Sequence, residues 1–289
     1  MLNVLQKIQS GMTRPILRYH GGKWILAPWI ISHFPAHKCY TEVFGGGGSV
    51  LLRKPRSYAE VYNDMWDTVV NVFRVLRDPD MAAALREQLY LTPFARTEFD
   101  GCREAQIRDC ADPVEKARLT ILRSFAGLGS ASTNAEHSTG FRANSNRSGT
   151  TPAHDWMNYP THIESFTERL RGVIIENRHY EQVLRTHDAE TTLHYVDPPY
   201  VFETRNLKRG NALYAYEMTD DQHREMSAVL HSLSGMVVLS GYECEMYAEL
   251  FGDWKLIRKE AHADGARDRV ECLWLNPLCA ARQKQMELF

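Results

Sequence analysis

The stretch CYTEVFGGGGSVLL, residues 39–52, joins a short apolar run to four consecutive glycines and then to a second apolar run. This order predicts a strand, a glycine loop and the start of a helix, as in nucleotide-binding α/β folds. Glycines such as Gly45 and Gly47 adopt conformations closed to other residues and let a nucleoside-like ligand lie against the main chain. A phosphate loop would need Gly-Lys-Ser/Thr at the helix entrance, so the Ser-Val-Leu-Leu found here disfavours a nucleoside triphosphate.

Two acidic residues flank the glycine loop. Glu42 precedes it and is placed to meet a positively charged group of a ligand. Asp64 follows a second expected strand, 58–62, about twenty residues beyond the loop, where this architecture places an acid on a ribose diol. The alternative for Asp64 is an N-cap of the helix expected over 66–76.

A second site is predicted where an apolar strand, 192–196, runs into Asp197-Pro198-Pro199-Tyr200. Tandem prolines lack N–H donors and hold the preceding residue extended, so the strand stops there in a rigid conformation. The Asp197 carboxylate and the Pro198 carbonyl can accept the hydrogens of an amino group on a planar molecule, while the Tyr200 ring offers a stacking face. The alternative is a stiff strand-to-loop turn without a ligand.

Near the N-terminus, the segment RYHGGK, residues 18–23, places a glycine pair ahead of a helix expected over 24–34. A lysine beside two glycines can meet a carboxylate close to the backbone, which makes Lys23 a site candidate. The alternative is a loop with a solvated lysine.

Residues 78–171 interrupt the alternation of strands and helices. Their helical patterns are separated by short polar breaks and are followed by a long polar segment. Helices are expected there over 81–90, 97–108 and 113–125.

The polar segment that follows has no acidic residue between Glu136 and Asp155. A stretch of that length without regular structure is usually functional or disordered. It contains Arg142, Asn144 and Arg147, and arginine and asparagine are side chains that hold phosphates and read base edges. The segment is therefore a candidate for contacting nucleic acid, and the alternative is a solvated loop.

Regular alternation returns after residue 171. Strands are expected over 172–176, 192–196, 236–239, 254–259 and 270–275, and helices over 180–185, 218–232 and 245–251. A second acid-poor stretch, between Tyr200 and Glu217, carries Lys208 and Arg209. These side chains either contact phosphates or belong to a solvated surface loop.

The composition of the chain limits the size of its core, the kind of partner it can bind and the compartment in which it works. A chain of 289 residues that is 44% hydrophobic can bury one large core, and its net charge of −2 confines any nucleic-acid surface to a local patch. The six cysteines form no C-x-x-C pair, so we expect reduced thiols and no structural zinc. Because no apolar run is long enough to span a bilayer and no signal peptide is evident, the expected location is cytoplasmic, without membrane association.

The order and spacing of RYHGGK, EVFGGGG, Asn63-Asp64 and Asp197-Pro-Pro-Tyr200 resemble the Dam-like family of N6-adenine DNA methyltransferases, over about residues 14–277. The resemblance implies an α/β class I methyltransferase fold with a doubly wound, mostly parallel seven-stranded sheet. It also implies S-adenosylmethionine as methyl donor and adenine flipped out of double-stranded DNA as acceptor. A monomer or weak dimer that uses no metal is expected.

The same resemblance divides the chain into three parts. Residues 1–77 would carry the cofactor motifs, 78–171 an inserted, mainly helical target-recognition domain, and 172–289 the Asp-Pro-Pro-Tyr site.

Site residues are carried over by motif. Asp197, Pro198 and Tyr200 would hold the target base. The residues implied at the cofactor are Tyr19, Lys23, Glu42, Phe44, Gly45, Gly47, Asp64 and Asp197. Of these, Tyr19 and Lys23 would line the methionine end and Asp64 the ribose, although the family often has tryptophan at the position of Tyr19 and Gly-x-Gly in the loop. The DNA contacts, assigned by location alone, are Arg142, Asn144, Arg147, Lys208 and Arg209.

Other functions remain open at this stage. Sites of this type also serve cytosine N4, RNA or glutamine side chains, all of which are planar amines, and aspartate at the first position favours adenine only by resemblance. A DNA-binding or cofactor-sensing protein without transfer activity is a further alternative, which the intact Asp197 and Lys23 argue against. Whether the enzyme belongs to a restriction-modification pair or stands alone is left undecided.

Overall fold

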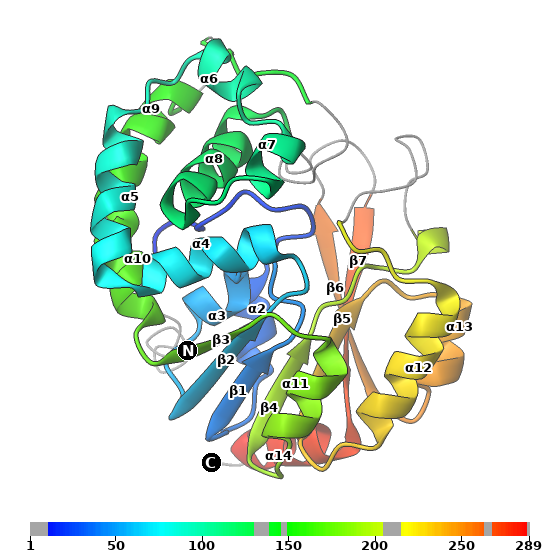
Figure 1. The fold of residues 1–289 in the computed structure, drawn as a ribbon. Helices are drawn as coiled ribbons and strands as arrows, with labels where there is room; N and C mark the ends of the chain where they lie inside the picture. The colour runs from blue at the N-terminus through cyan, green and yellow to red at the C-terminus, as the bar shows by residue number, and fades with distance from the viewer. Residues whose placement is uncertain (1–10, 130–138, 146–148, 205–214, 263–267, 288–289) are drawn as a thin grey trace.

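The computed structural model describes residues 11–129, 139–145, 149–204, 215–262 and 268–287. Its centre is a seven-stranded sheet in the order β3-β2-β1-β4-β5-β7-β6 (Figure 1). The strands are β1 (Cys39–Glu42), β2 (Ala59–Asn63), β3 (Val173–Glu176), β4 (Thr192–Val196), β5 (Met236–Gly241), β6 (Lys255–His262) and β7 (Asp268–Leu275). None of the helices within the described ranges is both long and apolar enough to cross a membrane.

The sheet is mixed. Strands β1 to β5 pair in parallel, whereas β7 runs antiparallel to both β5 and β6. The mostly parallel seven-stranded sheet expected from the sequence is thus confirmed. Its order differs from the 3-2-1-4-5-6 order of dinucleotide-binding domains, because β7 is inserted between β5 and β6. Parallel pairing brings the carboxyl ends of β1, β2 and β4 to one edge of the sheet, where such folds bind ligands.

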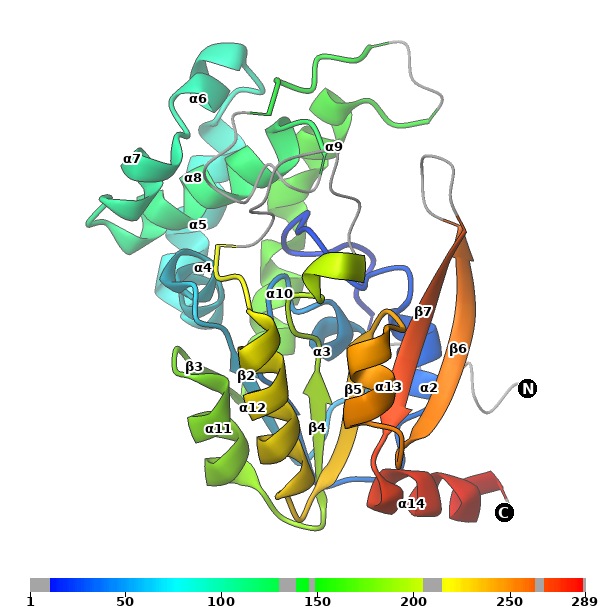
Figure 2. The same cartoon turned by 90° about the vertical axis from the view of Figure 1, so that its right-hand side faces the viewer.

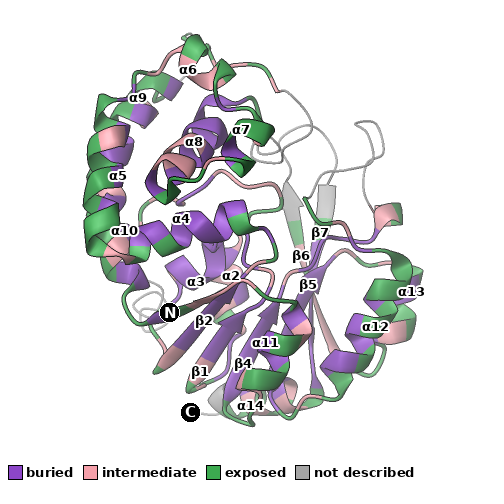
Figure 3. Ribbon diagram, in the orientation of Figure 1, coloured by how far each residue is buried: buried purple, intermediate pink, exposed green. Residues whose placement is uncertain are grey.

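Helices cover both faces of the sheet, which buries the strands on two sides and explains their almost continuous apolar sequences. In β5, Met236 and Val238 pack on one face, and Val237 and Leu239 on the other. Figure 3 shows the strands largely buried and the outer sides of the helices exposed. Among the described residues outside 78–171, the helices are α2 (Ala27–Ser32), α3 (Ser49–Arg53), α4 (Asp67–Arg77), α11 (Tyr180–His187), the 3-10 helix η3 (Phe202–Thr204), α12 (Asp220–His231), α13 (Glu245–Leu250) and α14 (Pro277–Glu287).

The described residues of 78–171, which leave out 130–138 and 146–148, contain a run of helices between α4 and β3. They are α5 (Pro79–Leu91), α6 (Arg96–Asp100), α7 (Glu104–Arg108), α8 (Pro113–Ala126), α9 (Pro152–Asn158), the 3-10 helix η2 (Tyr159–His162) and α10 (Ile163–Leu170). Asp78 and Asp112 cap α5 and α8, each followed by a proline at the first helical position. Figure 2 shows α6 to α9 on the side toward which β4 points. Their apolar side chains share one core with one face of the sheet.

Several expected helices differ in extent from the structure. The helix expected over 24–34 is confined to Ala27–Ser32, with Pro28 in its first turn. The one expected over 97–108 is broken at Gly101 into α6 and α7. Within the described residues, the sequence analysis did not predict the α-helices α9, α10 and α14. In α10 the buried residues Ile163, Phe166 and Leu170 recur at helical spacing, a signal that the sequence did carry.

A buried ion cluster ties the helical segment to the sheet. Glu60 of β2 lies between Lys54, 2.5 Å away, and Arg169 of α10, 2.7 Å away. All three side chains are at most 4% exposed. Burial opposes ionisation of Glu60, but the hydrogen bonds and charges of Arg169 and Lys54 outweigh it and lower the pKa of this carboxyl. The cluster therefore anchors α10 and the chain after α3 to β2.

Glu60→Ala is expected to destabilise the protein by about 3–5 kcal/mol, because it leaves two buried cations without their carboxylate. Urea denaturation measures the loss. The control is Glu181→Ala, which breaks an ion pair to Arg185 whose side chains are 54% and 39% exposed, and should cost about 1 kcal/mol or less. Equal losses in the two variants would contradict an anchoring role for Glu60.

Candidate active site

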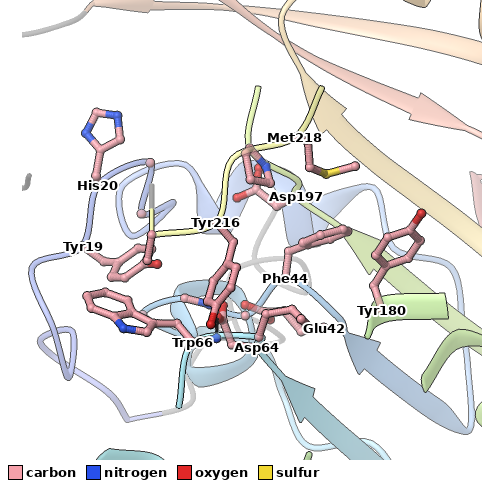
Figure 4. A pocket seen from close by; sticks show the side chains of 18 of the residues that line it. Tyr19, His20, Glu42, Phe44, Asp64, Trp66, Tyr180, Asp197, Tyr216 and Met218 are labelled. Carbon is pink, nitrogen blue, oxygen red and sulfur yellow. Dashed lines mark hydrogen bonds between the residues drawn. The ribbon is translucent and has the colours of Figure 1, made fainter. Parts of the chain in front are cut away.

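A pocket lies at the carboxyl ends of β1, β2 and β4 (Figure 4). All eight residues that the sequence placed at a cofactor line it: Tyr19, Lys23, Glu42, Phe44, Gly45, Gly47, Asp64 and Asp197. Further lining residues that the sequence analysis did not single out include Trp66, Tyr180, Tyr216, Met218, Gln222 and Glu225. Tyr19 and Trp66 stand on one side of the pocket in Figure 4, and Phe44 and Tyr180 on the other.

The glycines of the loop are needed for a steric reason that differs from the expected approach of a ligand. A Cβ atom on Gly45 would lie 2.3 Å from the ring of Tyr62, and one on Gly46 would lie 2.7 Å from the ring of Tyr19. Gly48 has a positive φ of 63° and enters α3. The missing side chains thus make room first for the protein's own aromatic rings. Gly45 and Gly47 still present backbone to the pocket.

Asp64 connects the glycine loop to the turn that precedes α4. Its Oδ2 accepts a hydrogen bond from the Gly46 N–H at 2.8 Å, and its Oδ1 accepts one from the Trp66 N–H at 2.8 Å. The alternative of an N-cap is wrong, because α4 begins at Asp67 with Trp66 in the cap position and without a side-chain cap. Burial raises the pKa of Asp64 although the backbone hydrogen bonds oppose the shift.

Glu42 is buried under the same loop. Its Oε2 accepts hydrogen bonds from the Leu51 N–H of α3 and from the Tyr40 hydroxyl, both at 2.7 Å. Desolvation raises the pKa of Glu42 to about 7, although both hydrogen bonds favour the ionised form. A cation placed beside Glu42 would favour the ionised form of this carboxyl group, so the part of the pocket next to Glu42 suits a positively charged ligand group.

Lys23 forms an ion pair with Asp197. The Lys23 Nζ lies 3.0 Å from Asp197 Oδ1 and donates a hydrogen bond to the Gly21 carbonyl at 2.8 Å. The side chains of Lys23 and Asp197 are 6% and 16% exposed. The expectation that Lys23 meets a carboxylate is confirmed, and the solvated-loop alternative is wrong. Lys23 also lines the pocket, and its place at the methionine end of a cofactor stays a prediction.

Tyr200 is buried rather than presented to the pocket. Its hydroxyl donates to Glu271 Oε2 at 3.1 Å, and Tyr242 packs edge-on against its ring with centroids 4.6 Å apart. The Lys23 Nζ lies 4.7 Å from the ring centroid. The ring is therefore held from several sides, and a base that stacks on the face under Lys23 has to displace that ammonium.

The candidate DNA contacts fall in two groups. Arg142 donates to the Phe125 carbonyl at 3.1 Å, which ties this segment to the end of α8, whereas Asn144 is exposed. Arg147, Lys208 and Arg209 lie outside the described residues. Across the described parts of the chain, His, Cys, Asp and Glu side chains form no group of three or more that could hold a metal ion.

Tyr200→Phe removes the hydroxyl that donates to buried Glu271. Urea denaturation should show a loss of about 1–3 kcal/mol, the scale of leaving a buried acceptor without its donor. Tyr58→Phe is the control, because Tyr58 is 94% exposed and its change should leave stability unaltered. Unchanged stability of Tyr200→Phe would mean that the Glu271 contact does not hold the ring in place.

Comparison with protein families agrees with this geometry. The model of the D12 class N6 adenine-specific DNA methyltransferases matches residues 19–264. The matched region contains the glycine loop, Asp64, the helical segment and Asp197, together with Tyr200. The chain belongs to the D12 class of N6 adenine-specific DNA methyltransferases and is an enzyme of DNA adenine methylation.

Proposed function

We propose that this enzyme transfers a methyl group from S-adenosylmethionine to N6 of an adenine flipped out of duplex DNA. One observation carries the proposal: a single pocket joins the glycine loop and Asp64, which suit a nucleoside, to Asp197, which suits a planar amine. The mixed seven-stranded sheet fits the class I methyltransferase fold that such a reaction uses.

The pocket fits the proposed donor in its chemistry. Two carboxylates, that of buried Glu42 and that of partly buried Asp64, suit a ligand that carries a ribose diol and positive charge, and the aromatic side chains around them suit a purine. S-adenosylmethionine supplies an electrophilic methyl group on a sulfonium. Asp64 would accept from the ribose hydroxyls while it continues to hold the Gly46 and Trp66 amides.

Asp197 and Pro198 would orient the acceptor. The N6 lone pair of adenine is delocalised into the ring, so the site has to hold the amino group with that lone pair facing the methyl group. Hydrogen bonds from N6 to the Asp197 carboxylate and the Pro198 carbonyl would do this and stabilise the positive charge that develops on nitrogen. The N6–methyl bond would form as the S–methyl bond breaks, which leaves the donor as a neutral thioether, and the extra N6 proton would then pass to the Asp197 carboxylate or to water. Positioning contributes more to this step than a strong base.

A base inside a duplex cannot reach this pocket, so the target adenine would be extruded and stacked on Tyr200. Entry on the face covered by Lys23 would require the ammonium, which lies 4.7 Å from the ring centroid and 3.0 Å from Asp197 Oδ1, to move. Residues 78–171 would form the target-recognition domain, with Arg142 and Asn144 near the DNA. Arg147, Lys208 and Arg209 are proposed as phosphate or base contacts on their sequence positions alone.

Asp64→Ala is expected to weaken S-adenosylmethionine binding by about 1–3 kcal/mol, the scale of a lost hydrogen bond to a charged group. Isothermal titration calorimetry measures the change, and thermal melting verifies that the variant is folded. Asp109→Ala, on the surface at the end of α7 with a side chain 69% exposed, is the control and should bind as the parent does. Parent affinity in Asp64→Ala would remove Asp64 from the cofactor site.

Asp197→Ala should slow methyl transfer by about a hundredfold or more, because it removes an oriented electrostatic partner of N6. Single-turnover transfer of tritium from labelled S-adenosylmethionine to duplex DNA measures the rate, and cofactor affinity should change less. Because Asp197→Ala leaves Lys23 without its carboxylate, Asp197→Asn serves as a second variant of nearly equal size. Transfer at the parent rate in both variants would contradict the proposed reaction centre.

A further inference from the structure

Ser240 is a buried polar residue at the end of an apolar strand. It follows Met236–Leu239 in β5 and is 1% exposed. Its Oγ donates a hydrogen bond to Asp197 Oδ1 at 2.6 Å. A hydroxyl buried at this depth costs free energy unless it is hydrogen-bonded, and alanine would fill almost the same volume. Alanine would lose this contact and two longer ones, to the Tyr195 hydroxyl at 3.1 Å and the Val196 carbonyl at 3.5 Å, and the bond to the Asp197 carboxylate is the shortest of the three.

The direction of the hydrogen bonds around Ser240 can be assigned from chemistry. Asp197 Oδ1 at 2.6 Å and the Val196 carbonyl at 3.5 Å can both accept the single Ser240 proton, and the much shorter bond to the carboxylate takes it. The Tyr195 hydroxyl lies 3.1 Å from Ser240 Oγ and then acts as the donor to it. Burial holds the pKa of Tyr195 well above its usual range, which keeps this donor proton in place. Protons thus point from Tyr195 to Ser240 to Asp197.

Two donors from different parts of the chain converge on one oxygen of Asp197. Lys23 reaches Oδ1 from the loop before α2, and Ser240 reaches the same Oδ1 from β5. One contact alone would let the carboxylate rotate about its Cβ–Cγ bond, whereas two contacts from different directions restrict that rotation. Because Oδ1 receives both, Oδ2 is the oxygen that can accept a hydrogen from a substrate.

We propose that Ser240 is a positioning residue for methyl transfer, whose hydroxyl fixes the rotation of the Asp197 carboxylate so that Oδ2 accepts the N6 hydrogen of the target adenine. The inference rests on the proposed role of Asp197. Tyr195 supports it indirectly, because its hydroxyl orients the Ser240 hydroxyl toward Asp197. Ser240 touches neither the base nor the donor and acts through Asp197 alone.

The test is a double-mutant cycle between positions 240 and 197, read as single-turnover tritium transfer. In the parent background, Ser240→Ala should slow transfer by about tenfold to a hundredfold, the scale of one hydrogen bond to a charged group. Its affinity for S-adenosylmethionine should stay within about twofold of the parent. In the Asp197→Ala background, the same Ser240→Ala change should have no further effect, because its target is gone.

Two further variants separate positioning from packing. Ser240→Cys fills the site with a slightly larger side chain and offers only a weak S–H donor, so it should slow transfer nearly as much as Ser240→Ala although it leaves no space empty. Ser227→Ala, which changes another buried serine, on α12, should transfer at the parent rate. Thermal melting of every variant checks that the fold survives.

The outcomes distinguish the positioning role of Ser240 from the proposed reaction centre at Asp197. Parent-like transfer by Ser240→Ala alongside a slow Asp197→Ala would overturn the role of Ser240 and leave the proposed reaction centre intact. Parent-like transfer by both Asp197→Ala and Asp197→Asn would overturn the reaction centre itself. An equal additional loss from Ser240→Ala in both backgrounds would show that Ser240 acts independently of Asp197 and would also overturn the inference.

Discussion

Parallel pairing of β1 with β2 and with β4 is the constraint on which the site depends. The register places Glu42 opposite both Tyr62 and Tyr195, so the strands β1, β2 and β4 end side by side at one edge of the sheet. The glycine loop, Asp64 and Asp197 follow these strand ends and therefore meet in one pocket. A shift of one residue in either pairing would exchange the faces of a strand and separate these groups.

Charge is distributed unevenly among the carboxylates of this pocket. Asp197 has the ammonium of Lys23 as a partner, whereas burial raises the pKa values of Glu42 and Asp64. Such a site binds a cationic ligand more readily than a neutral one, because the ligand's charge offsets part of the desolvation of the acids. A cationic ligand of this kind is what the proposed reaction would bring, because its donor is a sulfonium and its acceptor becomes positively charged during transfer.

Rigid packing supports both halves of the site. Tyr62 and Tyr19 fill the space beside the glycines, while Glu271 holds the hydroxyl of Tyr200. The helical segment is fixed to the same sheet through Glu60, so a DNA surface on those helices would be held at a constant distance from the pocket. Methyl transfer depends on positioning, and these contacts restrict the groups that have to be positioned.

Local signals in the sequence determined much of this protein. The glycine run, the tandem prolines and the alternation of apolar runs with polar breaks predicted the strands and the loop, because each depends on backbone preferences of neighbouring residues. The resemblance of the motifs to a known family implied eight of the residues that line the pocket. Only the tertiary structure decided the contacts between distant segments. The partners of Lys23 and Tyr200, and the approach of Ser240 to Asp197, come from strand order and register, which bring together residues that no local pattern relates.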